Sequence, residues 1–423
     1  MLSRWYAATF EALTVSQFRT LWMGTTIASL AFMMTRTVQS VVAFDLAGNS
    51  TAVGVVALGS GLSMVFLGPI GGVFADRLSK RKVLLVGQSL VGLSFLLIGA
   101  LIVSDRLTIG LLVALTFAMG LCFSFIGPTR QAYVGEVVPR DLLPNAVALS
   151  QLSMGFARVV SPLVAGLLIA WSFSGTGGTY IFMSSLFVLV VATLFQLPAS
   201  TPAASGRSVF GDLGAGLSHV RERPPLMLLV GSFIVVTIVG QPYVTVLPAL
   251  LEHELGQPTS RIGLMFMIEA AGGLITGLAA AGMVRGAAAW RLMLVMGVLA
   301  GLSLIGLALA PNFLMAALAM FVVGVGYTGF QVTNNALLMM EADAAYFGRV
   351  MSLMMLAFGG TGLVSFPIGL VADRIGERWM LGIEGGLVLV VAVAAWALYG
   401  VVRRRAARGV IASATAGDDE AAG

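Results

Sequence analysis

Apolar residues along this chain are grouped into long runs, each separated from the next by a short stretch rich in glycine, proline or charge. Turn signals such as Gly48-Asn49-Ser50 and Pro311-Asn312 mark these breaks. A run of roughly 18 or more apolar residues is long enough to cross a bilayer as a helix. The pattern predicts twelve spans, at about 18–44, 52–75, 83–104, 109–134, 145–171, 179–197, 226–250, 261–284, 291–310, 313–340, 347–372 and 379–402. We therefore expect an all-α membrane protein with twelve transmembrane helices.

The segment 198–225 differs from the spans because it combines prolines and glycine with serine and charge. It predicts a cytoplasmic linker between an N-terminal six-helix bundle at 1–197 and a C-terminal six-helix bundle at 226–402. The remaining segment, 403–423, is rich in alanine, glycine and acidic residues after its arginines. We expect it to be a disordered cytoplasmic tail.

The two halves echo one another in sequence. Thr129-Arg130-Gln131-Ala132 in the first half aligns with Thr333-Asn334-Asn335-Ala336 in the second. Because each half has six spans, both halves start on the same side of the membrane. Such repeats are related by a pseudo-two-fold axis along the membrane normal, and they place a substrate site at their interface near the midplane.

Composition and charge agree with a membrane protein. Hydrophobic residues make up 58% of the chain and charged residues 10%, against roughly 25% charged in a soluble domain. With both termini in the cytoplasm, 17 of the 24 Lys and Arg residues lie in inside segments and 4 in outside segments. This asymmetry follows the positive-inside rule. It predicts a multi-pass protein of the inner (plasma) membrane and explains the net charge of +5 without a nucleic-acid partner.

Several kinds of chemistry have little material in this chain. Cys122 is the one cysteine, and His219 and His253 are the two histidines. The sequence therefore predicts no metal site and no cofactor. It contains neither a phosphate-binding Gly-x4-Gly-Lys loop nor a nucleophile–His–acid set. We expect neither an ATP-driven pump nor an enzyme.

A motif follows the second span. Gly72 is followed after three residues by Asp76-Arg77, and then by Ser79 and the basic Lys80-Arg81-Lys82. This stretch resembles the signature between helices 2 and 3 of the major facilitator superfamily, with serine at the position where glycine is usual. The resemblance covers roughly residues 15–405. It implies two six-helix bundles that rock about a central site in alternating access.

The resemblance also implies a cytoplasmic gate. Gly72 would let a neighbouring helix approach closely, and Asp76 would face the positive N-terminal end of helix 11, expected near Phe347. Lys80 and Lys82 are interpreted as topology signals only. A similar sequence, Asp373-Arg374-Ile-Gly376, follows span 11 on the outside and is interpreted as a coincidence. The expected gate residues are Gly72, Asp76, Arg77, Arg81, Arg130, Glu136 and Arg349.

Two further stretches indicate a branch of the superfamily. The sequence from Pro128 through Ala132, followed by Pro139-Arg140 and Asn145-Ala146, is similar to the helix 4–5 connection of enterobactin-exporter-like and macrolide-efflux-like members. Arg158, Pro162 and Gly166 resemble the helix 5 pattern of export members. Small residues and proline also suit a purely structural seam between helices.

Two ionisable residues inside spans are candidates for transport, because burying a charge in the membrane is costly. Arg36 lies in span 1 with Gln39 on the same face, and it is a candidate for an anionic substrate. Glu269 is the acid clearly inside a span, and it is the candidate for binding and releasing a proton. The alternative is that Glu269 only pairs with Arg36 or another buried arginine. Glu384 in span 12 is expected to face the outer water layer.

Polar residues on spans 7 and 10 complete a candidate cavity. In the superfamily, helices 1, 4, 7 and 10 surround the central pathway, and Tyr327 would add an aromatic wall. The alternative for each residue is an interhelical hydrogen bond, worth about 0.6 to 2 kcal/mol. The expected cavity residues are Arg36, Gln39, Gln241, Tyr243, Tyr327, Gln331, Asn334 and Asn335.

These features together favour a secondary active transporter that exports a bulky lipophilic compound, a drug or a siderophore-like molecule, in exchange for protons. One buried acid and a methionine-rich interior favour export. Proton-coupled uptake of a small metabolite is the alternative, and a non-transporting receptor or scaffold is a further one. The expected partners are a small-molecule substrate, protons and the lipid bilayer, with the protein acting as a monomer.

Overall fold

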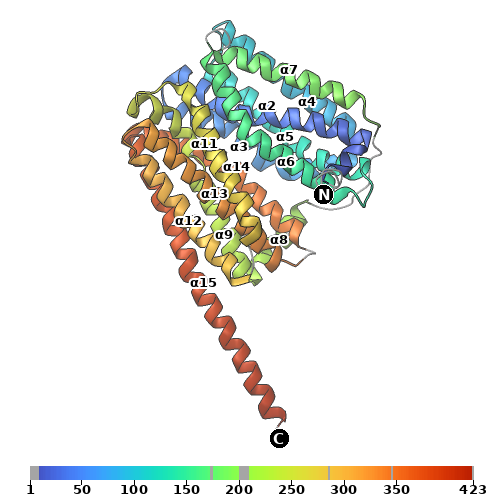
Figure 1. The fold of residues 1–423 in the computed structure, drawn as a ribbon, viewed down its shortest axis with the longest axis vertical. Helices are drawn as coiled ribbons and strands as arrows, with labels where there is room; N and C mark the ends of the chain where they lie inside the picture. The colour runs from blue at the N-terminus through green and yellow to red at the C-terminus, as the bar shows by residue number, and fades with distance from the viewer. Residues whose placement is uncertain (1–8, 172–174, 200–208, 284–285, 344–345, 422–423) are drawn as a thin grey trace.

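The computed structural model of the protein describes residues 9–171, 175–199, 209–283, 286–343 and 346–421. Within these ranges the chain is helical and contains no strand. Figure 1 shows two groups of helices, the first coloured blue to green and the second yellow to red. The expectation of an all-α protein in two bundles is confirmed.

The first group contains six long helices after a short 3₁₀ turn at Glu11–Thr14. They are α2 (Ser16–Ala47), α3 (Ser50–Arg77), α4 (Lys80–Val103), α5 (Ile109–Val137), α6 (Leu143–Ala170) and α7 (Gly175–Phe195). The second group contains α9 (Pro224–Gly240), α10 (Tyr243–Ala249), α11 (Ile262–Met283), α12 (Gly286–Ala308), α13 (Phe313–Glu341), α14 (Phe347–Ile375) and α15 (Glu377–Ala421).

Eleven segments of the described residues are long and apolar enough to cross a membrane. The twelfth is α3, whose apolar part covers Ser50–Phe66. The helices begin and end where turn chemistry places them. Gly48 ends α2 with a left-handed backbone (φ 67°), and the Asn312 side chain caps α13 by accepting from the Met315 N–H at 3.0 Å.

The seventh span is broken. Helix α9 ends at Gly240 and α10 begins at Tyr243. Pro242 lies between them and has no backbone N–H to continue the hydrogen-bond ladder. A π-helical turn, Leu250–Glu254, and a 3₁₀ turn, Thr259–Arg261, then lead into α11. Tyr243, the first residue after this break, contacts Arg36 of the other bundle.

Two segments differ from the sequence expectation. The linker 198–225 contains a helix, α8 (Val209–Glu222), which packs on α14 and α3. Beyond residue 402, where a disordered tail is expected, α15 continues as a helix to Ala421 and extends away from the bundles (Figure 1). The segment is rich in alanine and arginine, which are strong helix formers.

Candidate functional site: a polar cluster between the two bundles

The bundles meet along two pairs of helices, α3 with α14 and α6 with α11. Glycines make this approach possible. A Cβ added to Gly61 of α3 would lie 2.8 Å from Gly362 of α14. In the second pair, a Cβ on Gly263 of α11 would lie 2.4 Å from the Pro162 carbonyl oxygen and 2.6 Å from Gly166 Cα. Pro162 and Gly166, which belong to α6 and therefore to the fifth span, lie in a contact between the bundles.

Gly263→Val is expected to force α6 and α11 apart. Overpacking of this kind costs about 1–3 kcal/mol, which corresponds to a roughly 5–150-fold change in a conformational equilibrium. The measurement is cross-linking of Asp45→Cys to Thr259→Cys with a short thiol reagent, in a Cys122→Ala background, because the Thr259 hydroxyl donates to Asp45 across the bundles at 3.3 Å. The cross-linking yield should fall, by up to the factor by which this equilibrium shifts.

The matched control is Gly306→Val in α12, because no atom lies within 4 Å of a Cβ built on Gly306. The cross-linking yield of this control should equal that of the unmodified pair. An unchanged yield in Gly263→Val would show that the glycine contact does not limit how closely the bundles approach.

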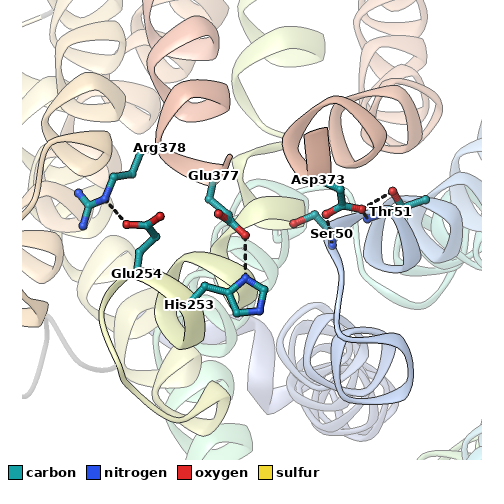
Figure 2. A network of polar contacts seen from close by, with 7 residues as sticks. All are labelled: Ser50, Thr51, His253, Glu254, Asp373, Glu377 and Arg378. Carbon is teal, nitrogen blue, oxygen red and sulfur yellow. Dashed lines mark hydrogen bonds and ion pairs between the residues drawn. The ribbon is translucent and has the colours of Figure 1, made fainter. Parts of the chain in front are cut away.

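One end of the bundle interface is held by a network of polar contacts (Figure 2). Asp373, near the end of α14, accepts hydrogen bonds from the backbone N–H groups of Ser50 and Thr51, each at 2.8 Å, and from the Thr51 hydroxyl. The carboxylate thereby caps the N-terminus of α3, a helix of the other bundle. Negative charge is favourable at this position because the helix dipole is positive there.

The same end carries a histidine–carboxylate contact and an ion pair within the second bundle. Nδ1 of His253 lies 2.9 Å from Oε1 of Glu377, and Arg378 donates to Glu254 at 2.6 Å. These pairs fasten the start of α15 to the end of the seventh span (Figure 2). We call this end of the molecule, where Asp373 contacts Ser50 and Thr51, the closed end.

A second polar cluster lies deeper between the bundles. Arg36 of α2 donates to the Tyr243 hydroxyl of α10 at 2.9 Å and pairs with Glu269 of α11 at 3.6 Å. The guanidinium also lies 4.5 Å from the centre of the Phe266 ring, within cation–π range. The structure thus brings together the cation and the acid that the sequence placed on different spans, one from each bundle.

This cluster is partly exposed. The Arg36 side chain is 40% exposed and the Glu269 side chain 15% exposed, although both lie between the bundles. Arg158 of α6, the helix that packs on α11, is also exposed. An arginine of the first bundle therefore pairs with a carboxylate of the second in a partly exposed part of the interface.

The remaining cavity candidates divide into two groups. Tyr243 is buried at Arg36, and its ring centre lies 6.4 Å from that of Tyr327. Gln39 instead donates to Thr116 within the first bundle, and Asn334 is fully buried and donates to the Leu229 carbonyl oxygen at 3.1 Å. The interhelical hydrogen bond considered as an alternative is what the structure shows for Gln39 and Asn334. Gln241, Gln331 and Asn335 are half-buried.

The gate candidates are also separated. Arg81 donates to the carbonyl oxygens of Leu194 and Phe195 at the end of α7, at 3.0 and 2.7 Å. Arg130 lines a small pocket inside the first bundle with Gln88 and Thr25. Arg349 lies 5.0 Å from the centre of the Tyr346 ring, two residues after the start of α14 at Phe347. Glu136 pairs with Lys80.

The side chains of Gly72, Asp76 and Arg77 lie outside those that the structure describes. The gate expected at Asp76 therefore stays a prediction. The start of the neighbouring helix at Phe347, which that prediction needs, agrees with the structure.

Three residues have surroundings that the sequence interpretation missed. Lys80, interpreted as a topology signal, is buried and ion-paired with Glu136. Asp373, interpreted as a coincidence, joins the two bundles. Glu384, expected to face the outer water layer, is fully buried inside the second bundle. The position of Glu384 along span 12 indicates how deep it lies in the membrane. The rotation of the helix about its axis decides whether the side chain faces outward or toward neighbouring helices.

Comparison with protein families identifies the group. A model of the Major Facilitator Superfamily matches residues 21–365, which is more than half of the chain. The chain belongs to the Major Facilitator Superfamily. It is therefore a multi-pass membrane transporter and not an enzyme.

Two named relatives of this superfamily member have roles in efflux. Macrolide efflux protein A of Streptococcus pyogenes is 22% identical over 399 residues, covering 89% of this chain and 94% of that protein. Enterobactin exporter EntS of Escherichia coli is 25% identical over 344 residues, covering 77% and 79%.

Among solved structures, the nucleoside transporter NupG superposes with a TM-score of 0.74 at 15% identity, covering 90% of this chain and 99% of that one. A bacterial homolog of the human lysosomal transporter Spinster, in an inward-facing and unoccupied conformation, gives 0.70 at 13% identity, covering 92% and 96%. At these identities the similarity concerns the fold.

Proposed function

We propose that this transporter exports a bulky lipophilic compound in exchange for protons, with Glu269 as the coupling residue. The observation that carries the proposal is the Arg36–Glu269 pair, because it joins the two bundles at a partly exposed position between them. The efflux roles in the names of the relatives support the direction of transport. The methionine-rich composition supports an adaptable apolar site for a large compound.

The pair explains how a proton and a substrate can exclude each other. An ionised Glu269 balances Arg36, and a proton on Glu269 removes that balance. A substrate that docks between the bundles must also interact with Arg36, Glu269 or both. Since one carboxylate cannot serve a proton and a substrate at once, binding of one promotes release of the other. Such competition is sufficient to couple two opposite fluxes through differential affinity.

The basic-residue asymmetry supports a proposed orientation with the closed end outside the inner membrane and both termini in the cytoplasm. The conformation described would then be closed outside and hydrated from the cytoplasm, ready to accept a substrate for export. Asp373 would be the outer latch, and opening it would be required for release. We propose that one chain performs this cycle as a monomer.

Arg36→Ala is expected to weaken export of anionic compounds more than that of neutral ones of equal lipophilicity. A hydrogen bond to a charged group contributes about 1.5–3 kcal/mol, so the selectivity ratio should fall roughly tenfold or more. The measurement is competition of matched anionic and neutral compounds against export of one fluorescent dye.

The control for this experiment is Arg106→Ala, which removes an exposed arginine between α4 and α5. It should leave both classes of competitor unchanged. An equal loss for anionic and neutral compounds in Arg36→Ala would show that Arg36 is a structural partner of Glu269 and does not select substrates.

A further inference from the structure

The second bundle contains a carboxyl group that the proposed coupling mechanism does not use. Glu384 of α15 has no exposed surface, and neither carboxylate oxygen has a hydrogen-bond partner among the described residues. An ionised carboxylate is strongly disfavoured in such a place, because nothing replaces the hydrogen bonds that water would give it. The conformation described therefore holds Glu384 in its protonated, neutral form.

The position of Glu384 adjoins the break in the seventh span. Gly240, the last residue of α9, leaves a space that is occupied by the Tyr327 hydroxyl and by Val388, which follows Glu384 by one helical turn. A Cβ on Gly240 would lie 1.8 Å from that hydroxyl. Glycine is thus required here so that Tyr327 of α13 can reach the region between α9 and α15.

The Tyr327 hydroxyl is itself buried and has no hydrogen-bond partner among the described residues. It lies against the same glycine, Gly240, as Val388, which is one helical turn from Glu384. The Tyr327 ring lies beside the Tyr243 ring, and the Tyr243 hydroxyl accepts from Arg36. Tyr327 and Tyr243 therefore lie between the region of Glu384 and the cluster at Arg36 and Glu269, although the Tyr327 hydroxyl makes no hydrogen bond in this conformation.

Other titratable groups near Glu384 are few. Helix α9 has none in its sequence, and α10 contributes Tyr243. The one charged residue of α12, Arg291, lies ten residues, or roughly 15 Å, before the Gly301 contact with Gly385.

The charged residues of α14 lie near the ends of that helix, at Arg349, Asp373 and Arg374. On α15 itself, Glu377 and Arg378 are paired with His253 and Glu254. Tyr327, and beyond it Tyr243, are therefore the titratable groups of the second bundle that lie nearest to this turn of α15 among the described residues.

We propose that Glu384 is a second proton-binding site, buried in the second bundle and exchanging its proton with water at the bundle interface by way of Tyr327 and Tyr243. The step breaks and forms O–H bonds only, and the proton passes between the carboxyl group and water. This inference rests on the proposed proton coupling, to which it adds a second carrier. It is distinct from Glu269, which lies at the interface and pairs with Arg36.

The test is infrared spectroscopy of the purified full-length protein in lipid nanodiscs, which detects the carbonyl stretch of protonated carboxyl groups. Between about pH 5 and about pH 9, wild type should show a buried-carboxyl band that changes with pH and is absent in Glu384→Gln. Glu384→Asp, which keeps a carboxyl group, should shift the band. A band that stays constant at every pH, or a spectrum that Glu384→Gln leaves unchanged, would overturn the proposal.

The route is tested by hydrogen–deuterium exchange of the same band. Tyr327→Phe should slow the exchange at least about tenfold, because it removes the hydroxyl between Glu384 and the interface. The matched control is Tyr180→Phe, a fully buried tyrosine of the first bundle whose hydroxyl also lacks a partner among the described residues. Equal rates in wild type and Tyr327→Phe would contradict the route.

These outcomes are independent of the exporter proposal. If Glu269→Gln abolishes proton-coupled transport and the Glu384 band changes with pH, both proposals are supported. Coupling that survives in Glu269→Gln, together with a pH-dependent Glu384 band, overturns Glu269 as the coupling residue and leaves Glu384 as a proton site.

Discussion

Glu269→Gln is expected to abolish transport against a concentration gradient while leaving exchange of substrate across the membrane intact. Glutamine keeps the size and hydrogen-bonding capacity of the side chain, but it cannot bind and release a proton. It also removes the charge that pairs with Arg36 at 3.6 Å. The measurement is accumulation of a transported dye in proteoliposomes, with an imposed pH gradient for uphill transport and with equal pH for exchange.

The control for Glu269→Gln is Glu252→Gln, an exposed carboxyl group of the π-helical turn after α10. It should behave as wild type in both assays. Loss of exchange and of uphill transport together in Glu269→Gln would mean that the residue holds the structure. Retained uphill transport would place proton coupling elsewhere in the chain.

Asp373→Asn is expected to shift the molecule away from the conformation that is shut at the closed end. Asparagine keeps one acceptor oxygen but loses the negative charge that faces the α3 N-terminus. A cap of this kind contributes about 0.5–2 kcal/mol, and 1 to 2 kcal/mol corresponds to a factor of roughly 5–30 in an equilibrium. The cross-link between Asp45→Cys and Thr259→Cys should form correspondingly less.

Asp105→Asn provides a matched control, because Asp105 is an exposed carboxyl group in the loop between α4 and α5. Its backbone is in the left-handed region (φ 53°), which asparagine also adopts readily. Cross-linking should be unchanged in this variant. If Asp373→Asn and Asp105→Asn gave the same yield as the unmodified pair, Asp373 would not hold the closed end.

The fold could be predicted from the sequence because the bilayer imposes a simple rule. A helix must cover roughly 18 or more apolar residues, and the breaks carry their own turn chemistry. The twelve predicted spans correspond to the long helices of the structure, with the seventh divided at Pro242. The tail after residue 402 is helical where disorder was expected. Its acids and glycines indicated disorder, while its alanines and arginines favour a helix.

The central pair could be predicted in part. The sequence identified Arg36 and Glu269 separately, since charges inside spans are rare and costly. Their proximity depends on how two bundles pack, which spacing along the chain does not determine. Gln39 and Asn334 have the same polar character as cavity residues, and only their contacts show that they serve packing.

Glu384 and Asp373 were misinterpreted for a common reason. Each lies at a position where the sequence gives the depth along a helix but not the direction in which the side chain points. Glu384 faces inward between neighbouring helices. Asp373 reaches the first turn of a helix more than 300 residues earlier in the chain. Contacts of this separation have no local sequence signal.

The measurement that tests the exporter proposal most directly is accumulation of a panel of lipophilic dyes and drugs in an efflux-deficient bacterial host, with and without an uncoupler. Cells expressing wild type should accumulate less of at least one compound than cells expressing Glu269→Gln. The uncoupler should raise wild-type accumulation to the level of the variant. Higher accumulation in wild type than in the empty host would indicate uptake and contradict export. A decrease that survives both the uncoupler and Glu269→Gln would contradict proton coupling through Glu269.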